Sequence, residues 1–202
     1  MRDPEFLPVM ESFYTIQGEG HFTGTPAYFV RLGGCDVGCH WCDVKESWDA
    51  SKFDWIHVND IVSQAKSSEA ELVVVTGGEP LMYDLSALTQ TLRANNLQCN
   101  IETSGAYKSS GNWDWVCFSP KKFKAPLEEF YDTSSELKIV VYNKSDLKWA
   151  EEHALRMHSN SKLYLQPEWS KEKEMTPLIV DFVKRNPKWK ISIQTHKYMQ
   201  IP

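Results

Sequence analysis

Three cysteines are the residues of this chain whose type and spacing most directly indicate chemistry. Cys35, Cys39 and Cys42 follow a C-x3-C-x2-C spacing. Three thiolates can hold three irons of a 4Fe-4S cluster and leave the fourth iron open to an outside ligand, whereas clusters that only carry electrons usually have four cysteine ligands. The spacing therefore indicates a cluster that takes part in a reaction.

Zinc is the first alternative, because three thiolates and His40 would make a tetrahedral ligand set. His40 lies between Cys39 and Cys42, where geometry rarely lets it join them, and no second Cys-x2-Cys pair follows at zinc-ribbon spacing. A disulfide framework is less favoured still. Cys99 and Cys117 fall within apolar, strand-like runs, so we expect them to be core residues.

Length and composition predict one domain that covers residues 1–202. The chain has 202 residues, of which 42% are hydrophobic, enough to bury a substantial core. No apolar stretch approaches the roughly 20 residues of a membrane span, and the N-terminus lacks the apolar segment of a secretory signal. The net charge is −5 and the basic residues are scattered, unlike those of a nucleic-acid binder. We expect a cytoplasmic protein with no nucleic-acid or membrane partner.

Short β-branched or aromatic runs alternate with amphipathic stretches along the chain. The predicted strands are residues 27–32, 72–76, 98–102, 115–118, 137–142, 162–165 and 190–194. The predicted helices are residues 57–66, 85–95, 146–157 and 176–185. Candidate helix boundaries are N-caps at Asn59 or Asp60, Asp84, Ser145 and Thr176, and a helix stop at Asn95 and Asn96.

This alternation predicts an α/β fold with a parallel sheet and crossover helices. The stretch 103–135 contains Pro120 and Pro126 and no clear helix, so one crossover is expected to be reduced. A complete eight-fold barrel needs roughly 250 residues, more than this chain has. We therefore expect an incomplete TIM-type barrel of parallel strands with reduced helices, open along one side.

Unusual residues follow two of the predicted strands, where the chemistry of such a sheet collects. The strand that starts at residue 72 runs into Thr76-Gly77-Gly78-Glu79-Pro80, and the next predicted strand runs into Thr103-Ser104-Gly105. Paired glycines let a ligand approach the backbone, and a glutamate offers a fixed acceptor for an ammonium group. Alone, this loop is compatible with ordinary turn chemistry. Beside the cysteines it becomes a strong signal.

Together these features resemble the radical S-adenosylmethionine (SAM) superfamily, and the residues around them resemble the 7-carboxy-7-deazaguanine synthase family. The resemblance covers residues 13–202 and rests on Gln17-Gly18-Glu19-Gly20, Arg31-Leu32-Gly33-Gly34, Cys42-Asp43, Lys45-Glu46-Ser47-Trp48, Gln194-Thr195-His196-Lys197 and Ile201-Pro202. It implies a lyase with a radical SAM core that takes part in queuosine and 7-deazapurine biosynthesis. The implied cofactors are a 4Fe-4S cluster, SAM and Mg²⁺.

The family's reaction starts from 6-carboxy-5,6,7,8-tetrahydropterin. The resemblance implies that a 5′-deoxyadenosyl radical from SAM takes the hydrogen at C6, and that ring contraction with loss of ammonia gives 7-carboxy-7-deazaguanine. The cofactors supply the reactivity, so the protein's task is orientation and exclusion of solvent. No catalytic residue is expected beyond the cluster and the SAM radical. A homodimer and an electron donor such as flavodoxin are also implied.

The resemblance assigns roles residue by residue. Cys35, Cys39 and Cys42 would hold the cluster. The implied SAM-binding residues are Trp41, Cys42, Asp43, Gly78, Glu79, Ser104, Ser119, Pro120, Lys121, Lys138, Gln166, Pro167, Glu168 and Trp169. The implied substrate-binding residues are Ile16, Gln17, Gly18, Glu19, Arg31, Thr76, His196 and Pro202.

Some of these roles have a physical basis of their own. Lys138 lies within an apolar strand, and a buried lysine needs an anionic partner, either Glu102 or the SAM carboxylate. Arg31 suits the pterin carboxylate through two parallel hydrogen bonds, while Gln17 and Glu19 suit the polar edges of the ring. The resemblance further implies that the terminal carboxylate of the chain reaches the substrate.

One position departs from the family pattern. Many members have threonine or serine directly after the Cys-Asp pair, where the hydroxyl helps to hold Mg²⁺, whereas this chain has Val44. Magnesium requires near-octahedral oxygen coordination, so one protein ligand is lost. Water or another residue would have to replace it, or the protein works without Mg²⁺ or with another cation. We expect a weak or absent Mg²⁺ requirement.

Three other classes compete with this interpretation. A glycyl-radical activase would share the cluster and the SAM loop but would act on a protein partner. A plain iron-sulfur electron carrier would not need the Gly-Gly-Glu-Pro loop, and a zinc-binding module would be colourless. Lys121, Lys122 and Lys124, if exposed, would suit the docking of an acidic flavodoxin.

Overall fold

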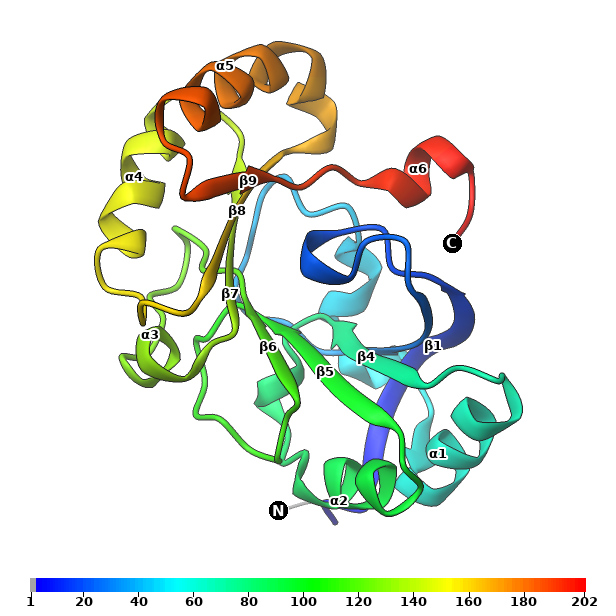
Figure 1. Cartoon of the computed structure of the whole chain (residues 1–202). Coiled ribbons are helices and arrows are strands. Elements are labelled where there is room, and N and C mark those ends of the chain that lie inside the picture. Colours follow the sequence, from blue (N-terminus) through cyan, green and yellow to red (C-terminus); the bar gives the residue numbers. More distant parts are fainter. Residues whose placement is uncertain (1–2) are drawn as a thin grey trace.

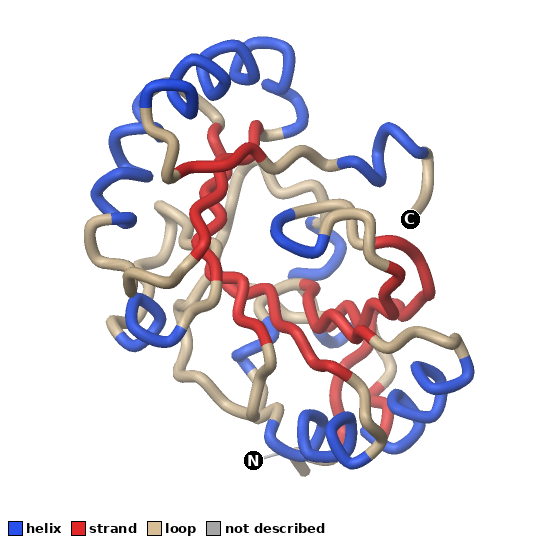
Figure 2. Tube along the Cα trace, viewed as in Figure 1, coloured by secondary structure: helices blue, strands red, loops and turns tan. Residues whose placement is uncertain are grey.

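The computed structural model describes residues 3–202, which are arranged around one curved β-sheet (Figures 1 and 2). Within these residues, the sheet has nine strands in the order β3-β1-β2-β4-β5-β6-β7-β8-β9. The strands are β1 (Phe6–Ile16), β2 (Pro26–Leu32), β3 (Trp55–His57), β4 (Leu72–Gly77), β5 (Gln98–Thr103), β6 (Trp115–Phe118), β7 (Glu136–Val141), β8 (Lys162–Pro167) and β9 (Trp189–Ile191). The α-helices are α1 (Val58–Ser67), α2 (Ser86–Ala94), α3 (Glu129–Thr133), α4 (Ser145–Ala154), α5 (Glu172–Arg185) and α6 (Thr195–Met199).

The sheet is mostly parallel and does not close. Strands β2 and β4 to β9 pair in parallel, and β1 pairs antiparallel with both β2 and β3. Strands β3 and β9 are the two edges, so the curve is open between them. The expected incomplete TIM-type barrel is confirmed.

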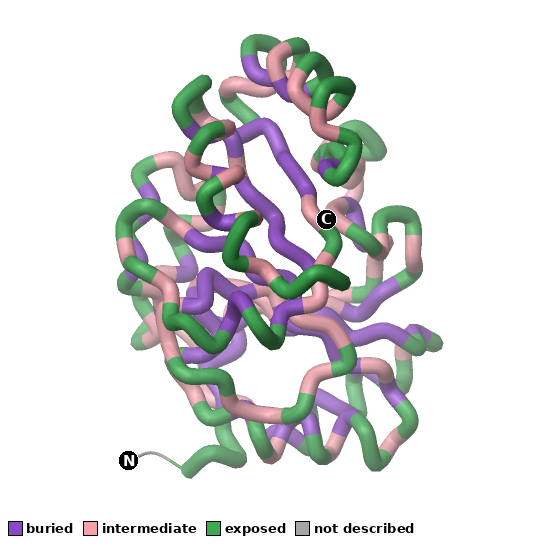
Figure 3. Tube along the Cα trace, turned by 60° about the vertical axis from the view of Figure 1, so that its left-hand side comes forward, coloured by how far each residue is buried: buried purple, intermediate pink, exposed green. Residues whose placement is uncertain are grey.

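The two faces of the sheet have different partners. Strand side chains alternate between faces, and β4 illustrates the result. Val73 belongs to the main hydrophobic core together with Ile61 of α1. Val74 packs against Phe22, and Thr76 lines a cavity. The outer face is therefore apolar and covered by helices, while the inner face is partly polar and carries the candidate site. Figure 3 shows long buried stretches in the interior, and around them helices in which buried and exposed residues alternate.

Helix α1 shows how the outer layer forms. Val58, Ile61, Val62 and Ala65 are buried and recur at the helical spacing that places them on one face of the helix. The helix begins after His57, whose Nδ1 accepts a hydrogen bond from the Asn59 backbone N–H at 3.1 Å. Both predicted N-caps for this helix, Asn59 and Asp60, are therefore wrong, by two and three residues.

Other boundaries also differ from the prediction. Helix α5 begins at Glu172, so Thr176 lies within the helix rather than at its N-cap. The N-cap of α4 is Lys144, and Ser145 is its first residue. Strand β9 ends at Ile191, three residues before the predicted end. Asn95 is the C-cap of α2 as expected.

Strands β1 and β3 were not predicted. Strand β1 contains a register shift between Val9 and Glu11, which breaks the alternation that would reveal it in the sequence. Strand β3 has three residues and pairs only with β1. Both lie outside the repeating strand–helix pattern, because they extend the sheet in antiparallel fashion beyond β2.

The loop between β1 and β2, residues 17–25, turns into the concave side of the sheet (Figure 1). We call it the inner loop. The Gly20 N–H donates to Ser192 Oγ at 2.9 Å, and the His21 N–H donates to Glu136 Oε2 at 3.1 Å. The inner loop therefore reaches from β1 across the open barrel to β7 and to the segment after β9.

Candidate active site

The three cysteines lie in one loop between β2 and the short turn Lys45–Trp48. Cys39 is buried, Cys35 and Cys42 are partly exposed, and each is a free thiol that lines the same cavity. Backbone hydrogen bonds fix the start of the loop, because the Cys35 N–H donates to the Trp48 carbonyl oxygen at 3.2 Å. The cysteines therefore lie at one end of the parallel strands, beyond the carboxyl end of β2.

The donors in this loop suit a cluster better than a single ion. No three His, Cys, Asp or Glu side chains within residues 3–202 are arranged to hold one metal ion. In a 4Fe-4S cluster each thiolate binds a different iron, so the three sulfurs need not converge on one point. Burial raises the pKa of Cys39 to about 11, and burial also raises the pKa of Cys35. A positively charged metal centre would favour the thiolate forms.

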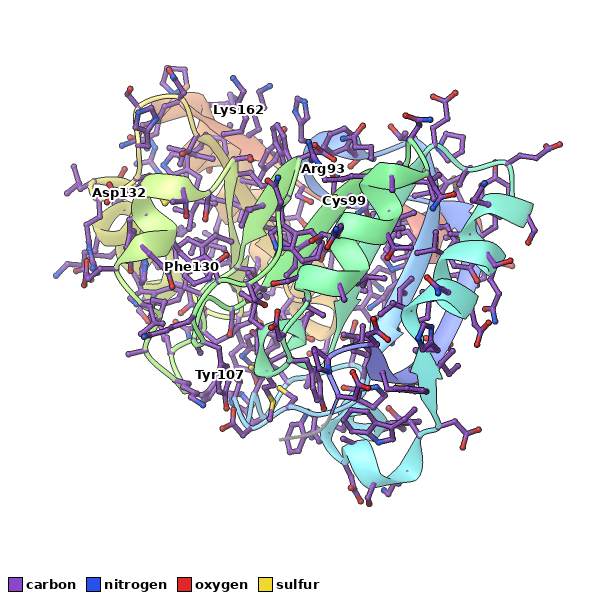
Figure 4. The ribbon with its side chains drawn as sticks, turned by 90° about the horizontal axis from the view of Figure 1, so that it is seen from below. Arg93, Cys99, Tyr107, Phe130, Asp132 and Lys162 are labelled. Carbon is purple, nitrogen blue, oxygen red and sulfur yellow. The ribbon has the colours of Figure 1, made fainter. Side chains whose placement is uncertain are left out.

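Cys99 and Cys117 lie apart from this loop, as expected of core residues. Cys99 is fully buried at the start of β5, beside Arg93 of α2 (Figure 4). Cys117 is buried in β6, and neither thiol lines the cavity.

The Gly-Gly-Glu-Pro loop after β4 packs directly on the cysteine loop. The Glu79 N–H donates to the Gly34 carbonyl oxygen at 2.8 Å, and the Gly78 N–H donates to the Leu32 carbonyl oxygen at 2.8 Å. A Cβ atom on Gly78 would overlap the Gly34 carbonyl oxygen and press on Cys35. The paired glycines therefore allow two backbone segments to touch.

Glu79 is almost completely buried, and both its oxygens accept hydrogen bonds from the protein. Oε1 accepts from the Leu81 N–H at 3.1 Å and from Thr103 Oγ1 at 2.6 Å. Oε2 accepts from the Ser104 N–H at 2.8 Å and from the Ser104 hydroxyl. A carboxylate has about four acceptor positions. An ammonium group that binds Glu79 must therefore displace one of the two hydroxyl donors.

The floor of the cavity contains a buried cluster of charges. The Lys138 ammonium group lies between two carboxylates, 3.0 Å from Glu102 Oε2 and in direct contact with Glu19 Oε2. Gln17 Nε2 donates to Glu102 Oε1 at 3.0 Å, and Gln194 Nε2 donates to Glu19 Oε1 at 2.8 Å. Glu102 was an expected partner of Lys138, whereas Glu19 was expected to face the substrate alone.

This arrangement keeps the groups charged. Burial opposes the charge on Glu19, but the attraction and hydrogen bond of Lys138, with the hydrogen bond of Gln194, lower the pKa of Glu19 to about 2. Burial also opposes the charge on Lys138, and the neighbouring anionic groups raise its pKa well above the usual value. The floor therefore presents fixed charges at neutral pH.

One cavity of about 270 Å³ brings together the predicted residues. The predicted residues that line it are Ile16, Gln17, Gly18, Glu19, Arg31, Cys35, Cys39, Trp41, Cys42, Asp43, Val44, Thr76, Gly78, Glu79, Ser104, Ser119, Lys121, Lys138, Gln166, Pro167, Glu168, Trp169, His196 and Pro202. Pro120 is the exception, because it lines a separate cavity beside His40. The cavity is thus enclosed by residues from the two ends of the chain and from the ends of the parallel strands.

Comparison with known proteins agrees with this geometry. Residues 29–117 match the family described as the radical SAM superfamily. A 7-carboxy-7-deazaguanine synthase of Flavobacterium psychrophilum is 59% identical over 98% of this chain and 94% of that protein. The enzyme of the same name from Synechocystis is 42% identical over 96% of this chain and 93% of that protein.

The chain belongs to the 7-carboxy-7-deazaguanine synthase family. A solved structure, described as the crystal structure of QueE from Escherichia coli, matches with a TM-score of 0.82 and 31% identity over 94% of both chains. The family resemblance noted in the sequence is therefore confirmed. Within residues 3–202, no helix is both long and apolar enough to cross a membrane.

The C-terminal segment forms one wall of the cavity in this family member. The Thr195 N–H donates to the Gly18 carbonyl oxygen at 3.0 Å, and Thr15 Oγ1 donates to Pro202 O at 3.2 Å. Lys197 pairs with Asp43 at 2.9 Å and so connects this segment to the cysteine loop. Burial lowers the pKa of His196, which favours its neutral form.

Arg31 and Val44 both line the cavity, and each is hydrogen-bonded to a different neighbouring residue. Arg31 Nε donates to Glu11 Oε1 at 2.6 Å, an ion pair between β2 and β1. The Val44 carbonyl oxygen accepts from the Ser47 N–H at 3.1 Å and from Ser47 Oγ at 2.7 Å. Val44 thus contributes a side chain without oxygen, and the neighbouring hydroxyl is bonded to its backbone.

The expected basic patch is largely neutralised. Lys122 pairs with Asp146, and Lys124 pairs with Asp36 at 2.7 Å. Lys121 points into the cavity wall, where its Nζ donates to Ser119 Oγ at 2.6 Å and burial lowers its pKa. The structure therefore does not support the expectation that these lysines offer a positive docking surface.

Several cavity residues were not assigned a site role from the sequence. Phe13 and Phe29 belong to β1 and β2, and their rings stack at 5.6 Å. Glu102, Val140 and Gln194 also line the cavity. Strand alternation carries a signal for two of them, because Glu102 and Val140 alternate with the core residues Ile101 and Ile139. Phe13 had no such signal, because β1 itself was not predicted.

Proposed function

We propose that this chain catalyses the conversion of 6-carboxy-5,6,7,8-tetrahydropterin to 7-carboxy-7-deazaguanine with loss of ammonia, as a carbon–nitrogen lyase of queuosine and 7-deazapurine biosynthesis. The observation that carries the proposal is that the three cysteines, Glu79 and the charge cluster on the floor line one cavity. Family membership supports the same reaction. When bound, a 4Fe-4S cluster with SAM supplies radical hydrogen abstraction.

The cysteine loop and the loops beside it are proposed to hold the cluster and SAM. Cys35, Cys39 and Cys42 would bind the cluster, and Glu79 would orient the amino group of SAM after that group displaces the hydroxyl of Thr103 or Ser104. Trp41, Asp43, Ser119, Lys121 and the residues 166–169 complete this half of the cavity. Their chemical role is to orient the cofactor and to exclude water.

The inner loop and the C-terminal segment are proposed to hold the pterin. Gln17 and Glu19 present polar groups to the cavity, and His196 stands beside Gly18, where a Cβ atom would overlap its ring. Arg31 has further N–H groups beyond the one bonded to Glu11, which suits a substrate carboxylate. The terminal carboxylate of Pro202 would accept from pterin N–H groups.

Magnesium dependence is proposed to be weak or absent. Val44 lines the cavity with an aliphatic side chain, and Mg²⁺ requires oxygen ligands in near-octahedral geometry. Ser47 Oγ donates to the Val44 carbonyl oxygen at 2.7 Å. Because residue 44 is a valine, a bound Mg²⁺ would have no side-chain oxygen ligand at that position.

A low-potential electron donor such as flavodoxin, a homodimeric state and a cytoplasmic location stay predictions from the family resemblance. The neutralised lysines give flavodoxin docking no added support.

The test is an anaerobic assay of reconstituted protein with SAM, dithionite and 6-carboxytetrahydropterin, with the product followed by mass. Cys39→Ser should lose the cluster and all product formation. Cys99→Ser is the matched control, because Cys99 is buried outside the cavity, and it should keep both. Cleavage of SAM by the wild-type protein without 7-carboxy-7-deazaguanine would refute the substrate, and no cleavage by cluster-loaded protein would refute the radical reaction.

A further inference from the structure

Glu136 is a buried carboxylate that the proposed function does not use. It is only 2% exposed, it is the first residue of β7, and it is absent from the cavity lining. The nearest ammonium group on the same strand, that of Lys138, is already bound between Glu19 and Glu102. Burying a carboxylate costs free energy unless hydrogen bonds compensate. An apolar side chain would fill the same space without this cost. The role of Glu136 therefore lies in the hydrogen bonds that its carboxylate accepts.

Those hydrogen bonds hold the inner loop. Glu136 Oε2 accepts from the His21 backbone N–H at 3.1 Å and from Trp115 Nε1 at 3.2 Å. The His21 ring stacks on the Trp115 ring, with centroids 4.5 Å apart and planes 11° apart. Gly20 adopts a φ of +64°, and a Cβ atom there would overlap Glu136 Oε1. The glycine at this position is thus required both by its backbone and by the carboxylate beside it.

The loop that Glu136 holds carries three cavity residues. Gln17, Gly18 and Glu19 lie within four residues of His21, and all three line the cavity. The inner loop has a second anchor, because the Gly20 N–H donates to Ser192 Oγ at 2.9 Å. Its other backbone hydrogen bonds are made within residues 17–25 or to Thr195. Two contacts therefore tie the inner loop to β7: the Glu136 carboxylate binds the His21 backbone N–H, and the Lys138 ammonium group binds the Glu19 side chain. Of these two, the Glu136 contact holds the backbone of the loop.

We infer that Glu136 is a positioning residue, which fixes the inner loop and thereby sets Gln17 and Glu19 in the substrate half of the cavity. The inference rests on the proposed function for the identity of the substrate. It assigns no contact between Glu136 and substrate or cofactor. Burial raises the pKa of Glu136, yet the anchoring requires only an acceptor oxygen, which a glutamine also supplies.

The test combines hydrogen–deuterium exchange with kinetics on anaerobically reconstituted protein. In Glu136→Ala, amide exchange in residues 17–24 should become about tenfold faster or more, because a hydrogen bond to a charged acceptor is lost. The KM for the pterin and the ratio of 5′-deoxyadenosine to product should both rise severalfold, while cluster content and SAM binding stay unchanged. Glu136→Gln should restore exchange and KM towards the wild type.

Asp114→Ala is the matched control. Asp114 also has a carboxylate that accepts a backbone hydrogen bond, from the Cys99 N–H at 2.9 Å, but it lies outside the cavity. Its loss should affect exchange near Cys99 and leave both the inner loop and KM unchanged. If Glu136→Ala fails to fold, Glu136→Met keeps most of the side-chain volume, removes the acceptor oxygens and should likewise accelerate exchange in residues 17–24.

Unchanged exchange in residues 17–24 of a folded Glu136→Ala protein would overturn the anchoring. Faster exchange with unchanged KM and unchanged coupling would overturn the positioning role. Hydrogen–deuterium exchange is measured without substrate. Its result therefore does not depend on whether the proposed function is correct. If the wild-type protein forms no 7-carboxy-7-deazaguanine, the proposed function fails, and exchange alone still decides whether Glu136 holds the loop.

Discussion

Removing the ammonium group of Lys138 should strongly destabilise this protein. Its side chain is 4% exposed, and those of its partners Glu19 and Glu102 are 14% and 22% exposed. Lys138→Met leaves both carboxylates without their cation. Removal of one partner from a buried ion pair typically costs about 3–5 kcal/mol, because the remaining charge is left uncompensated.

The pKa of Glu19 reflects the net effect of burial, which raises it, and of Lys138, Gln194 and His196, which lower it. It falls from 4.5 to about 2, which corresponds to roughly 3 kcal/mol in favour of the charged form. Because the folded-state pKa lies below the unfolded one, this stabilisation is present above about pH 4.5 and is lost as the pH falls towards 2. Measurements at pH 7 therefore contain the whole contribution.

The assay is a double-mutant cycle of Lys138→Met and Glu19→Gln, with urea unfolding of anaerobically reconstituted protein at pH 7. We expect a coupling free energy of about 3 kcal/mol, and a fall of about 1–2 M in the urea midpoint of Lys138→Met. Lys148 and Glu152, an exposed pair on α4, provide the control cycle and should show little coupling. A coupling below about 1 kcal/mol for Lys138 and Glu19 would refute the reasoning.

Three further changes test the site. Gly78→Ala should reduce the iron bound per chain severalfold, because its Cβ atom would overlap the Gly34 carbonyl oxygen; full iron content would contradict the proposed contact between the two loops. Val44→Thr should increase the stimulation of product formation by Mg²⁺ severalfold by adding an oxygen ligand, and a wild-type rate that chelation abolishes and Mg²⁺ alone restores would oppose the proposal. A segment added after Pro202 should lower kcat or raise KM at least tenfold, because Pro202 lines the cavity and its O accepts from Thr15 Oγ1; unchanged kinetics would exclude a role of Pro202 in substrate binding.

Local patterns in the sequence were enough to predict most of the parallel sheet. Residues 115–118 were predicted as a strand and form β6 with the same bounds. Side chains that alternate between a helix-covered face and the cavity produce a period of two, which is visible without knowledge of the fold. Strand β1 was missed, because its register shift interrupts that period and its partners lie at the end of the sheet. The predicted start of α5 was too late. Proline is common at the first position of a helix, whereas Pro177 lies within this one.

The sequence predicted which residues gather in the cavity best where those residues are close together along the chain. The cysteine spacing and the Gly-Gly-Glu-Pro loop are each confined to a few positions, so their chemistry can be recognised locally. The resemblance implied Pro120 as a SAM-binding residue together with Ser119 and Lys121, yet Pro120 lines a different cavity. Lys122 and Lys124 were considered for flavodoxin docking on the condition that they are exposed, and the sequence does not reveal that Asp146 and Asp36 lie beside them.

The sequence by itself determined the strand–helix alternation, the ligand chemistry of the cysteines and the membership of a family. These properties depend on residue type and short spacing, which folding does not alter. Only the tertiary structure decided that Lys138 pairs with Glu19, which lies 119 positions away, and that Glu136 holds the inner loop. Such contacts form only when folding brings segments that are distant in the sequence to the same face of the sheet. No local periodicity specifies them.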